Sequence, residues 1–459
     1  MRHALNTIAA ALTVSLGLAA CGPTQPAGDR ATPAAVEVSV YDGAFATIQQ
    51  FTTPGGVSVW LVEEPSIPIL SLQMAWPTGT ISDPVGQDGL TSAVAYMMNE
   101  GAGAYDNQAF QMRMEELNMS FGCSADRVST ACSASMLTDN LEPSFDLIGL
   151  AYAAPRFDTG PFERLVRERE VGLQTRQTNA RYLAERALIE ALYPDHAFAR
   201  QMTEESLAAL TPEAAKAHKD RLMSREGLLV TAVGAVSPDQ LAPLIDGMIA
   251  GLPETAETLL ASPVDMAAPR SVPLIVDLPQ PQSLVRFVGP AVPRDHPDFY
   301  PLAVMNYIFG GGGFGTRLMD ELRVARGLTY GIYTSVDPDS NLPVLSGGGT
   351  TKNDSAAEFV EAIQAEMVKL AEGGAEASEL EDALLYLIGS YPLSFDSNAK
   401  IAANMMSLRL DDLPVDQFDR RNELISAVTL DDVNRVATTY LDPERYTFVI
   451  VGEPVGLAP

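Results

Sequence analysis

This sequence repeats one plan in two stretches, LTPEAAKAHKDRLMSREGLLVTAVGAV at residues 210–236 and AVTLDDVNRVATTYLDPERYTFVIVGEPV at residues 427–455. When Thr211 is set on Thr429, the glycine near the end of each stretch also coincides, because both pairs are 218 residues apart. In each stretch a polar residue caps an amphipathic helix, a short turn follows, and an apolar β-rich run ends the unit. The repeat indicates that one α+β unit has been duplicated.

The rest of the chain fits two domains of this kind. About 420 residues follow residue 40, which is too many for one hydrophobic core and suits two. Between the repeats, LPETAETLLASPVDMAAPRSVP at residues 252–273 is rich in proline, alanine and glutamate and has the composition of a linker. We therefore predict two homologous domains, at residues 41–262 and 263–459, each a sheet with helices packed on one face.

The N-terminus has the pattern of an export signal. A positive start at Arg2 precedes an uncharged run over residues 4–20 that ends in small residues. This run is shorter than the roughly 20 apolar residues that cross a bilayer, and no later window approaches that length, which excludes a polytopic membrane protein. We predict a signal peptide over residues 1–20.

The end of this signal, LAACG at residues 18–22, resembles the lipobox of bacterial lipoproteins, in which the cysteine is acylated and becomes the mature N-terminus. The resemblance implies lipidation at Cys21, and the alternative is a plain signal peptide that contains a cysteine. The residue after the cysteine is Gly22 rather than aspartate, which by the same resemblance favours anchoring in the outer over the inner membrane. Residues 21–40 have few large apolar side chains and are predicted to form a flexible tether in the periplasm.

The charge balance excludes one class of partner. The chain has 59 acidic and 30 basic residues, a formal net charge of −29. Neither nucleic acid nor an anionic lipid surface attracts such a chain, so we predict no nucleic-acid partner and a membrane contact only through the lipid.

Two further cysteines lie in SFGCSADRVSTACSAS at residues 120–135. A tight turn centred between Arg127 and Val128 would place Cys123 directly opposite Cys132 on a hairpin, the arrangement that a cross-strand disulfide requires in an oxidising compartment. A metal site is the weaker alternative, because no other cysteine or histidine lies nearby in the sequence.

Residues 56–105 resemble the N-terminal domain of the pitrilysin, insulinase and mitochondrial processing peptidase family, in its short bacterial form. That family carries an HxxEH motif on the helix that follows a Gly-Leu pair, with two imidazoles as zinc ligands and the carboxylate as general base. Here the same helix reads TSAVAY after Gly89-Leu90, so Ser92 and Tyr96 occupy the ligand positions and Ala95 the position of the base.

The family's third zinc ligand is a glutamate on a later helix. In RLVREREVGLQTRQT at residues 164–178 our alignment places Thr175 there, with Glu168 and Glu170 nearby if the register shifts. One carboxylate cannot make a zinc site, and none of the four histidines is spaced as HxxxH. We predict that this chain binds no metal and no other cofactor.

The second half carries FGGGGFGTRLMDELRVARGLTYGIYTSV at residues 309–336, which resembles the family's C-terminal domain. There an arginine and a tyrosine seven residues apart reach the active site from the side opposite the metal, and here these are Arg323 and Tyr330. A protonated phenol could donate a hydrogen bond to the oxyanion, and a guanidinium could hold the substrate carbonyl. Gly327 is predicted to stop the helix before the strand that carries Tyr330.

The resemblance covers nearly the whole mature chain and implies an α+β fold of two mainly antiparallel sheets that forms half of a clamshell. It implies a non-metal subunit that supplies Arg323 and Tyr330 to a zinc-bearing HxxEH partner in a heterodimeric peptidase acting on peptides or unfolded segments. The alternative is a catalytically inactive lipoprotein of the cell envelope that binds peptides or acts as a chaperone.

Overall fold

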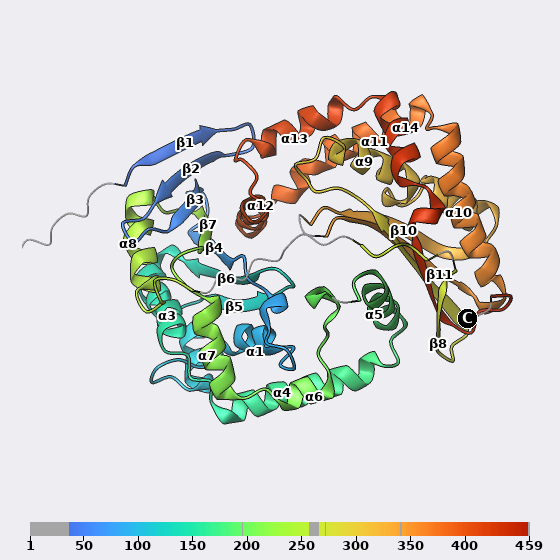
Figure 1. Cartoon of the computed structure of the whole chain (residues 1–459). Helices are drawn as coiled ribbons and strands as arrows, with labels where there is room; N and C mark the ends of the chain where they lie inside the picture. The colour runs from blue at the N-terminus through green and yellow to red at the C-terminus, as the bar shows by residue number, and fades with distance from the viewer. Residues whose placement is uncertain (1–35, 195, 257–265, 271, 340–341, 458–459) are drawn as a thin grey trace, which may run out of the picture. The chain divides into compact units, whose positions relative to one another are not determined.

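The computed structural model of the chain describes residues 36–194, 196–256, 266–270, 272–339 and 342–457 (Figure 1). The predicted signal peptide, Cys21, most of the predicted tether and the predicted boundary at residue 262 lie outside the described residues. Within the described part, no helix is both long and apolar enough to cross a membrane. The predicted α+β fold with two sheets is confirmed.

The first sheet has seven strands in the order β1-β2-β3-β7-β4-β6-β5. All neighbours are antiparallel except β3 and β7. The strands are β1 (Val38–Asp42), β2 (Thr47–Thr52), β3 (Ser58–Glu63), β4 (Ile69–Trp76), β5 (Ser120–Ala125), β6 (Thr130–Leu137) and β7 (Leu229–Gly234). Strand β1 begins inside the range predicted for the tether, so the ordered chain starts before residue 41.

The second sheet has five strands in the order β10-β11-β9-β12-β8, and only β8 and β12 are parallel. Its strands are β8 (Leu274–Asp277), β9 (Gln282–Pro290), β10 (Thr329–Asp337), β11 (Val344–Lys352) and β12 (Thr447–Gly452). Strand β10, which carries Tyr330, is therefore an edge strand.

The helices of the first half are α1 (Leu90–Met97), α2 (Asn107–Glu116), α3 (Leu141–Ala153), α4 (Thr159–Arg176), α5 (Ala180–Leu192), α6 (Glu204–Ala208), α7 (Pro212–Leu222) and α8 (Pro238–Ile249). Those of the second half are α9 (Phe299–Asn306), α10 (Ala356–Gly373), α11 (Ala377–Ser390), α12 (Asn398–Leu410), α13 (Gln417–Ser426) and α14 (Leu430–Tyr440). Short 3₁₀ turns span Thr80–Ser82, Thr138–Asn140, Ala197–Ala199, Asn353–Ser355, Tyr391–Phe395 and Pro443–Arg445. Two segments, Tyr307–Gly311 and Met319–Ala325, are π-helical.

The repeat found in the sequence is visible in the elements. Helices α7 and α14 begin 218 residues apart, and so do strands β7 and β12. The two 13-residue helices α5 and α12 are separated by the same interval. The duplicated unit is therefore longer than the stretches from which it was inferred.

Each sheet also receives one helix from the other half, which the sequence did not predict. Helix α12 of the second half covers β7 and β4, where Met405 and Leu408 pack with Trp60 and Val233. Helix α5 of the first half covers β12, β9 and β8. Hydrogen bonds add to the first contact, because the Thr231 hydroxyl donates to a carbonyl of α12 at 2.8 Å. Helices of its own half thus pack on one face of each sheet, and an exchanged helix covers part of the other face (Figure 1).

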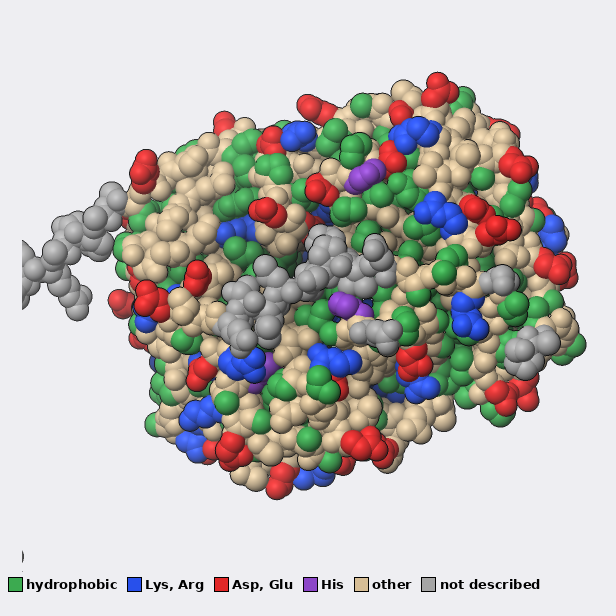
Figure 2. Space-filling model, in the orientation of Figure 1, with side chains coloured by type: hydrophobic (Ala, Val, Ile, Leu, Met, Phe, Trp, Pro, Cys, Tyr) green, Lys and Arg blue, Asp and Glu red, His purple; other side chains and the backbone are tan. Residues whose placement is uncertain are grey.

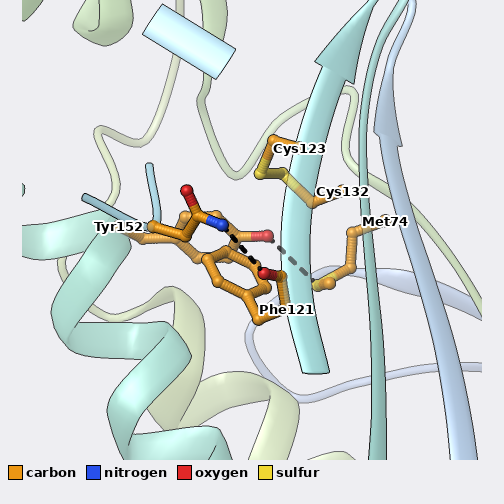
Figure 3. The surroundings of a disulfide bond; sticks show 6 residues. Met74, Phe121, Cys123, Cys132 and Tyr152 are labelled. Carbon is orange, nitrogen blue, oxygen red and sulfur yellow. Dashed lines mark hydrogen bonds between the residues drawn. A yellow bond between two sulfur atoms is a disulfide. The ribbon is translucent and has the colours of Figure 1, made fainter. Parts of the chain in front are cut away.

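The β5–β6 hairpin has the predicted register, with Cys123 opposite Cys132. A disulfide joins them, beside a cluster in which the Tyr152 ring meets Phe121 edge-on and the Tyr152 hydroxyl donates to the Met74 sulfur at 3.2 Å (Figure 3). The bond links an edge strand to the interior of the first sheet.

Replacing both cysteines with alanine should lower the free energy of unfolding by about 2 to 3 kcal/mol, because the disulfide closes a loop between residues nine apart. Urea unfolding with and without dithiothreitol measures this. The wild type should lose stability in the reductant while the double variant does not respond. Equal stability of the two proteins without reductant would contradict the prediction.

Candidate functional site

Arg323 lies in a π-helical segment that ends before Gly327. The wider turn is closed by the Arg326 amide, which donates to the Glu321 carbonyl at 3.1 Å. Single π-helical turns are frequent at functional sites because they displace side chains from the regular helical spacing. Gly327 has a positive φ of 64°, so the predicted helix stop is confirmed and the chain turns directly into β10.

Tyr330 projects from a β-bulge at the start of the edge strand β10. The register between β10 and β11 shifts between Thr329 and Ile332, so Tyr330 lies outside the regular ladder. The Thr329 hydroxyl holds the bulge by donating to the Thr350 carbonyl at 2.7 Å and accepting from the Gly331 amide at 3.1 Å. The Tyr330 side chain is 87% exposed, unusual for a large aromatic residue in a strand.

Arg323 and Tyr330 both keep their polar groups free. No described residue forms a hydrogen bond or ion pair with the Arg323 guanidinium or the Tyr330 hydroxyl, and the two side chains do not bond to each other. The guanidinium instead lies 4.6 Å from the centre of the Phe314 ring. The donors that the sequence predicted are therefore available to a ligand at one edge of the second sheet.

Phe314 is a site residue that the sequence analysis missed. It is 73% exposed and stands between Gly313 and Gly315, whose positive φ angles of 79° and 83° lift it out of the chain path. An aromatic residue between two glycines, nine positions before Arg323, was the available signal. The contact restricts the rotamers of Arg323 without occupying its donors.

The glycine run before Phe314 allows close packing of the backbone. A Cβ on Gly310 would lie 2.8 Å from the Thr334 hydroxyl oxygen, and one on Gly311 would lie 2.5 Å from the Asn306 side-chain nitrogen. The run therefore lets the π-helical segment at 307–311 approach β10. Arg317, which follows this run, is held to α11 by two hydrogen bonds that it donates to Glu379, at 2.7 and 2.6 Å.

The positions that hold zinc ligands in HxxEH chains lie on α1. Ala95 is buried at 2% exposure, and Ser92 and Tyr96 are half-buried. Arg164 on α4 donates to Glu100 at 2.5 Å, and its hydrogen bond with Tyr96, together with the Glu100 charge, raises the pKa of Arg164. A hydroxyl, a methyl and a phenol beside a fixed cation do not fit a zinc site, which requires imidazole, thiolate or carboxylate ligands.

Helix α4, where the family carries its third zinc ligand, adds no metal ligand to these positions of α1. Thr175 is exposed, and its hydroxyl donates to the Val171 carbonyl at 2.9 Å within α4. Glu168 and Glu170 are exposed on the same helix. The described residues contain no cluster of three or more His, Cys, Asp or Glu side chains that could hold a metal ion.

A buried polar cluster holds the start of α1, and the sequence analysis missed it too. Asp83 accepts from the Gly89 and Thr91 amides, each at 2.7 Å, and from the Thr91 hydroxyl at 2.6 Å. Because the Thr91 proton points to Asp83, the His218 Nε2 at 2.8 Å must donate to the Thr91 oxygen. All three side chains are buried, so this cluster stabilises the start of α1.

Family models match both halves of this arrangement. A model described as insulinase, peptidase family M16, matches residues 58–206, and a model described as the peptidase M16 inactive domain matches residues 209–387. The chain belongs to peptidase family M16. The resemblance inferred from the sequence is thereby confirmed.

Individual relatives extend the match over most of the chain. A protein of Helicobacter pylori named non-peptidase homolog YmxG is 22% identical over 89% of this chain and 94% of its own length. A protein of Bacillus subtilis named uncharacterized zinc protease YmxG is 20% identical over 90% of this chain and its entire length. The first relative is thus named as a non-peptidase and the second as a zinc protease.

Solved M16 structures share the fold. The crystal structure of a peptidase M16 inactive domain from Pseudomonas fluorescens has a TM-score of 0.82 at 25% identity and covers 90% of this chain and all of its own. The crystal structure of a protease from Helicobacter pylori has a TM-score of 0.78 at 14% identity, and it covers 89% of this chain and all of its own.

Proposed function

We propose that this chain is the non-metal subunit of a two-chain M16 peptidase, with a homologous HxxEH chain as its partner. One observation carries the proposal. The chain keeps Arg323 and Tyr330 with free donors at an exposed sheet edge, while Ser92, Ala95 and Tyr96 replace the zinc ligands and the base. For this chain to act in peptide hydrolysis, a partner would have to supply the zinc and the base that it lacks.

The geometry suits a supporting role in peptide hydrolysis. The partner's zinc site would supply the activated water that attacks the peptide bond. Tyr330 would donate its hydroxyl proton in a hydrogen bond to the oxygen that becomes negative, and Arg323 would hold that carbonyl or orient the phenol. Strand β10 is an edge, so an extended peptide could also pair with its backbone.

The proposed location is the bacterial envelope. The support is the signal pattern over residues 1–20 and the lipobox cysteine Cys21, which together favour a lipid anchor facing the periplasm, in the outer membrane.

On the face drawn in Figure 2, basic side chains are dispersed among acidic ones and form no single basic patch. That distribution supports peptides rather than nucleic acid as the ligand class.

A second candidate function is peptide binding without cleavage. The Helicobacter pylori relative named a non-peptidase homolog favours it, as do the replaced zinc positions. Under this proposal the chain would hold peptides or unfolded segments as a chaperone does, and Arg323 and Tyr330 would contact ligand without assisting chemistry.

Isolation of the tagged protein from its native membrane distinguishes the two functions. We expect a homologous HxxEH chain to copurify, with about one zinc ion per pair and peptide hydrolysis that a chelator abolishes. The single chain should not hydrolyse peptides. A metal-free protein without such a partner would refute the subunit proposal and favour binding alone, and chelator-sensitive hydrolysis by the single chain would refute both.

A further inference from the structure

Arg286 is a half-buried cation with no hydrogen-bond or ion-pair partner among the described residues. It lies in the middle of β9, on the face of the second sheet that α5 covers. No described residue forms a hydrogen bond or ion pair with its guanidinium, and Arg181 and Glu185 are the charged residues that influence its pKa. Burial lowers the pKa of Arg286, with a further decrease from Arg181. A guanidinium has five donors, so leaving them without acceptors in a partly dry site is costly unless a ligand supplies acceptors.

The sheet is shaped to expose this guanidinium. Gly348 of β11 lies directly opposite Arg286, and a Cβ there would come within 2.8 Å of the Arg286 Cδ. The missing side chain lets the arginine stem lie across β11. Arg286 therefore borders a cavity of about 470 Å³ between α5 and the sheet, a volume typical of sites for small ligands.

The walls of this cavity have two characters. One is aliphatic and combines α5 with β9 and β11; it consists of Leu188, Ile189, Leu192, Val288, Leu342 and Val344. The other is polar, with Ser346 beside the carboxylates of Asp126, Glu185, Asp337 and Asp339. Arg127 also lines the cavity, but it lies 3.8 Å from Glu185 and is partly neutralised by it.

The charges and the two walls of this cavity determine which kind of anion can bind to Arg286. The acidic groups repel any anion, and they repel a dianion such as phosphate about twice as strongly as a single carboxylate, which can still meet the Arg286 fork bidentately. The aliphatic wall accommodates an apolar group next to that carboxylate, and the polar wall requires hydrogen-bonding groups that a hydrocarbon chain lacks. A peptide end combines all three properties.

We propose that the Arg286 cavity binds the C-terminal carboxylate of a peptide whose last side chain is apolar. The carboxylate lies against the guanidinium, the last side chain packs on α5, and the preceding amides face Ser346 and Asp126. The site uses neither Arg323 nor Tyr330, so it does not depend on a zinc-bearing partner, and its test can fail or succeed independently of the proposed function.

Binding of a dye-labelled Ala-Ala-Leu peptide to the purified full-length chain tests the proposal by fluorescence anisotropy. The free acid should bind at least about tenfold more tightly than the C-terminal amide, because only the acid gives Arg286 a charged acceptor. Unlabelled octanoate and inorganic phosphate should compete weakly. Equal affinity for acid and amide, no binding of either peptide, or stronger competition by octanoate or phosphate than by unlabelled Ala-Ala-Leu would overturn the proposal.

Variants separate a ligand role from a structural one. Arg286→Gln should abolish the preference for the free acid without lowering the melting temperature, because the guanidinium has no described partner to lose. Arg186→Gln, an exposed arginine of α5 paired with Glu190 at 3.3 Å, should bind like the wild type. Should Arg286→Gln fail to fold, Ser346→Leu fills the cavity with Arg286 in place and should reduce free-acid binding by at least about tenfold. Unchanged binding by a folded Arg286→Gln or Ser346→Leu variant would refute the site.

Discussion

Replacing Tyr330 with phenylalanine should lower kcat of the assembled two-chain peptidase by about 10²- to 10³-fold, the usual effect of removing one donor to the oxyanion. The phenyl ring keeps the bulk of the side chain, and the hydroxyl has no bond to any described residue. The folded chain therefore loses no hydrogen bond. KM should change little, because the donor acts mainly on charge that develops in the transition state.

Steady-state kinetics on the copurified pair measures this effect. Tyr333→Phe provides a matched control, since Tyr333 is a second exposed tyrosine of the same edge strand. It should retain wild-type kcat. An unchanged kcat would refute a role of the phenol in the chemistry, and a change in KM alone would show that the phenol only binds substrate.

Replacing Asp83 with alanine should lower the free energy of unfolding by about 3 to 5 kcal/mol. The carboxylate accepts three hydrogen bonds from Gly89 and Thr91 at the start of α1, and it is only 4% exposed. Alanine would leave those donors buried without acceptors. Because Thr91 also bonds His218 on α7, the loss should loosen the packing between the two helices.

Urea unfolding followed by circular dichroism measures the change. Asp106→Ala is the matched control, because Asp106 caps α2 by accepting from the Ala109 amide at 2.9 Å in an exposed setting. An exposed cap of this kind contributes about 1 kcal/mol. Equal losses in the two variants would show that burial of Asp83 adds nothing to its role as a cap.

The fold was predictable because its evidence is local and repeated. The 218-residue interval places α7 on α14 and β7 on β12, and helical and strand patterns identify those elements within each repeat. The exchanged helices were not predictable, because an amphipathic helix shows that it has an apolar face and not which sheet covers it.

The candidate site was predictable where its residues are near in sequence. The spacing of Arg323 and Tyr330 and the helix stop at Gly327 could be recognised in the sequence. The bulge at Tyr330 depends on pairing with Gly349 and Thr351, which lie 19 or more positions later. Phe314, Asp83 and Arg286 escaped notice for a related reason. Their roles arise from contacts made after folding, and none belongs to a motif that spacing alone can reveal.

The exchange of α12 determines when, during synthesis, the first sheet can be covered. The last strand of the first sheet is complete at Gly234, but the helix that covers one face of that sheet begins only at Asn398. At 5 to 20 residues per second, the ribosome needs roughly 10 to 30 s to make the residues between them. Throughout that time the apolar face containing Trp60 and Val233 lacks its cover. The first half therefore emerges as an unfinished domain that waits for a helix made 164 residues later.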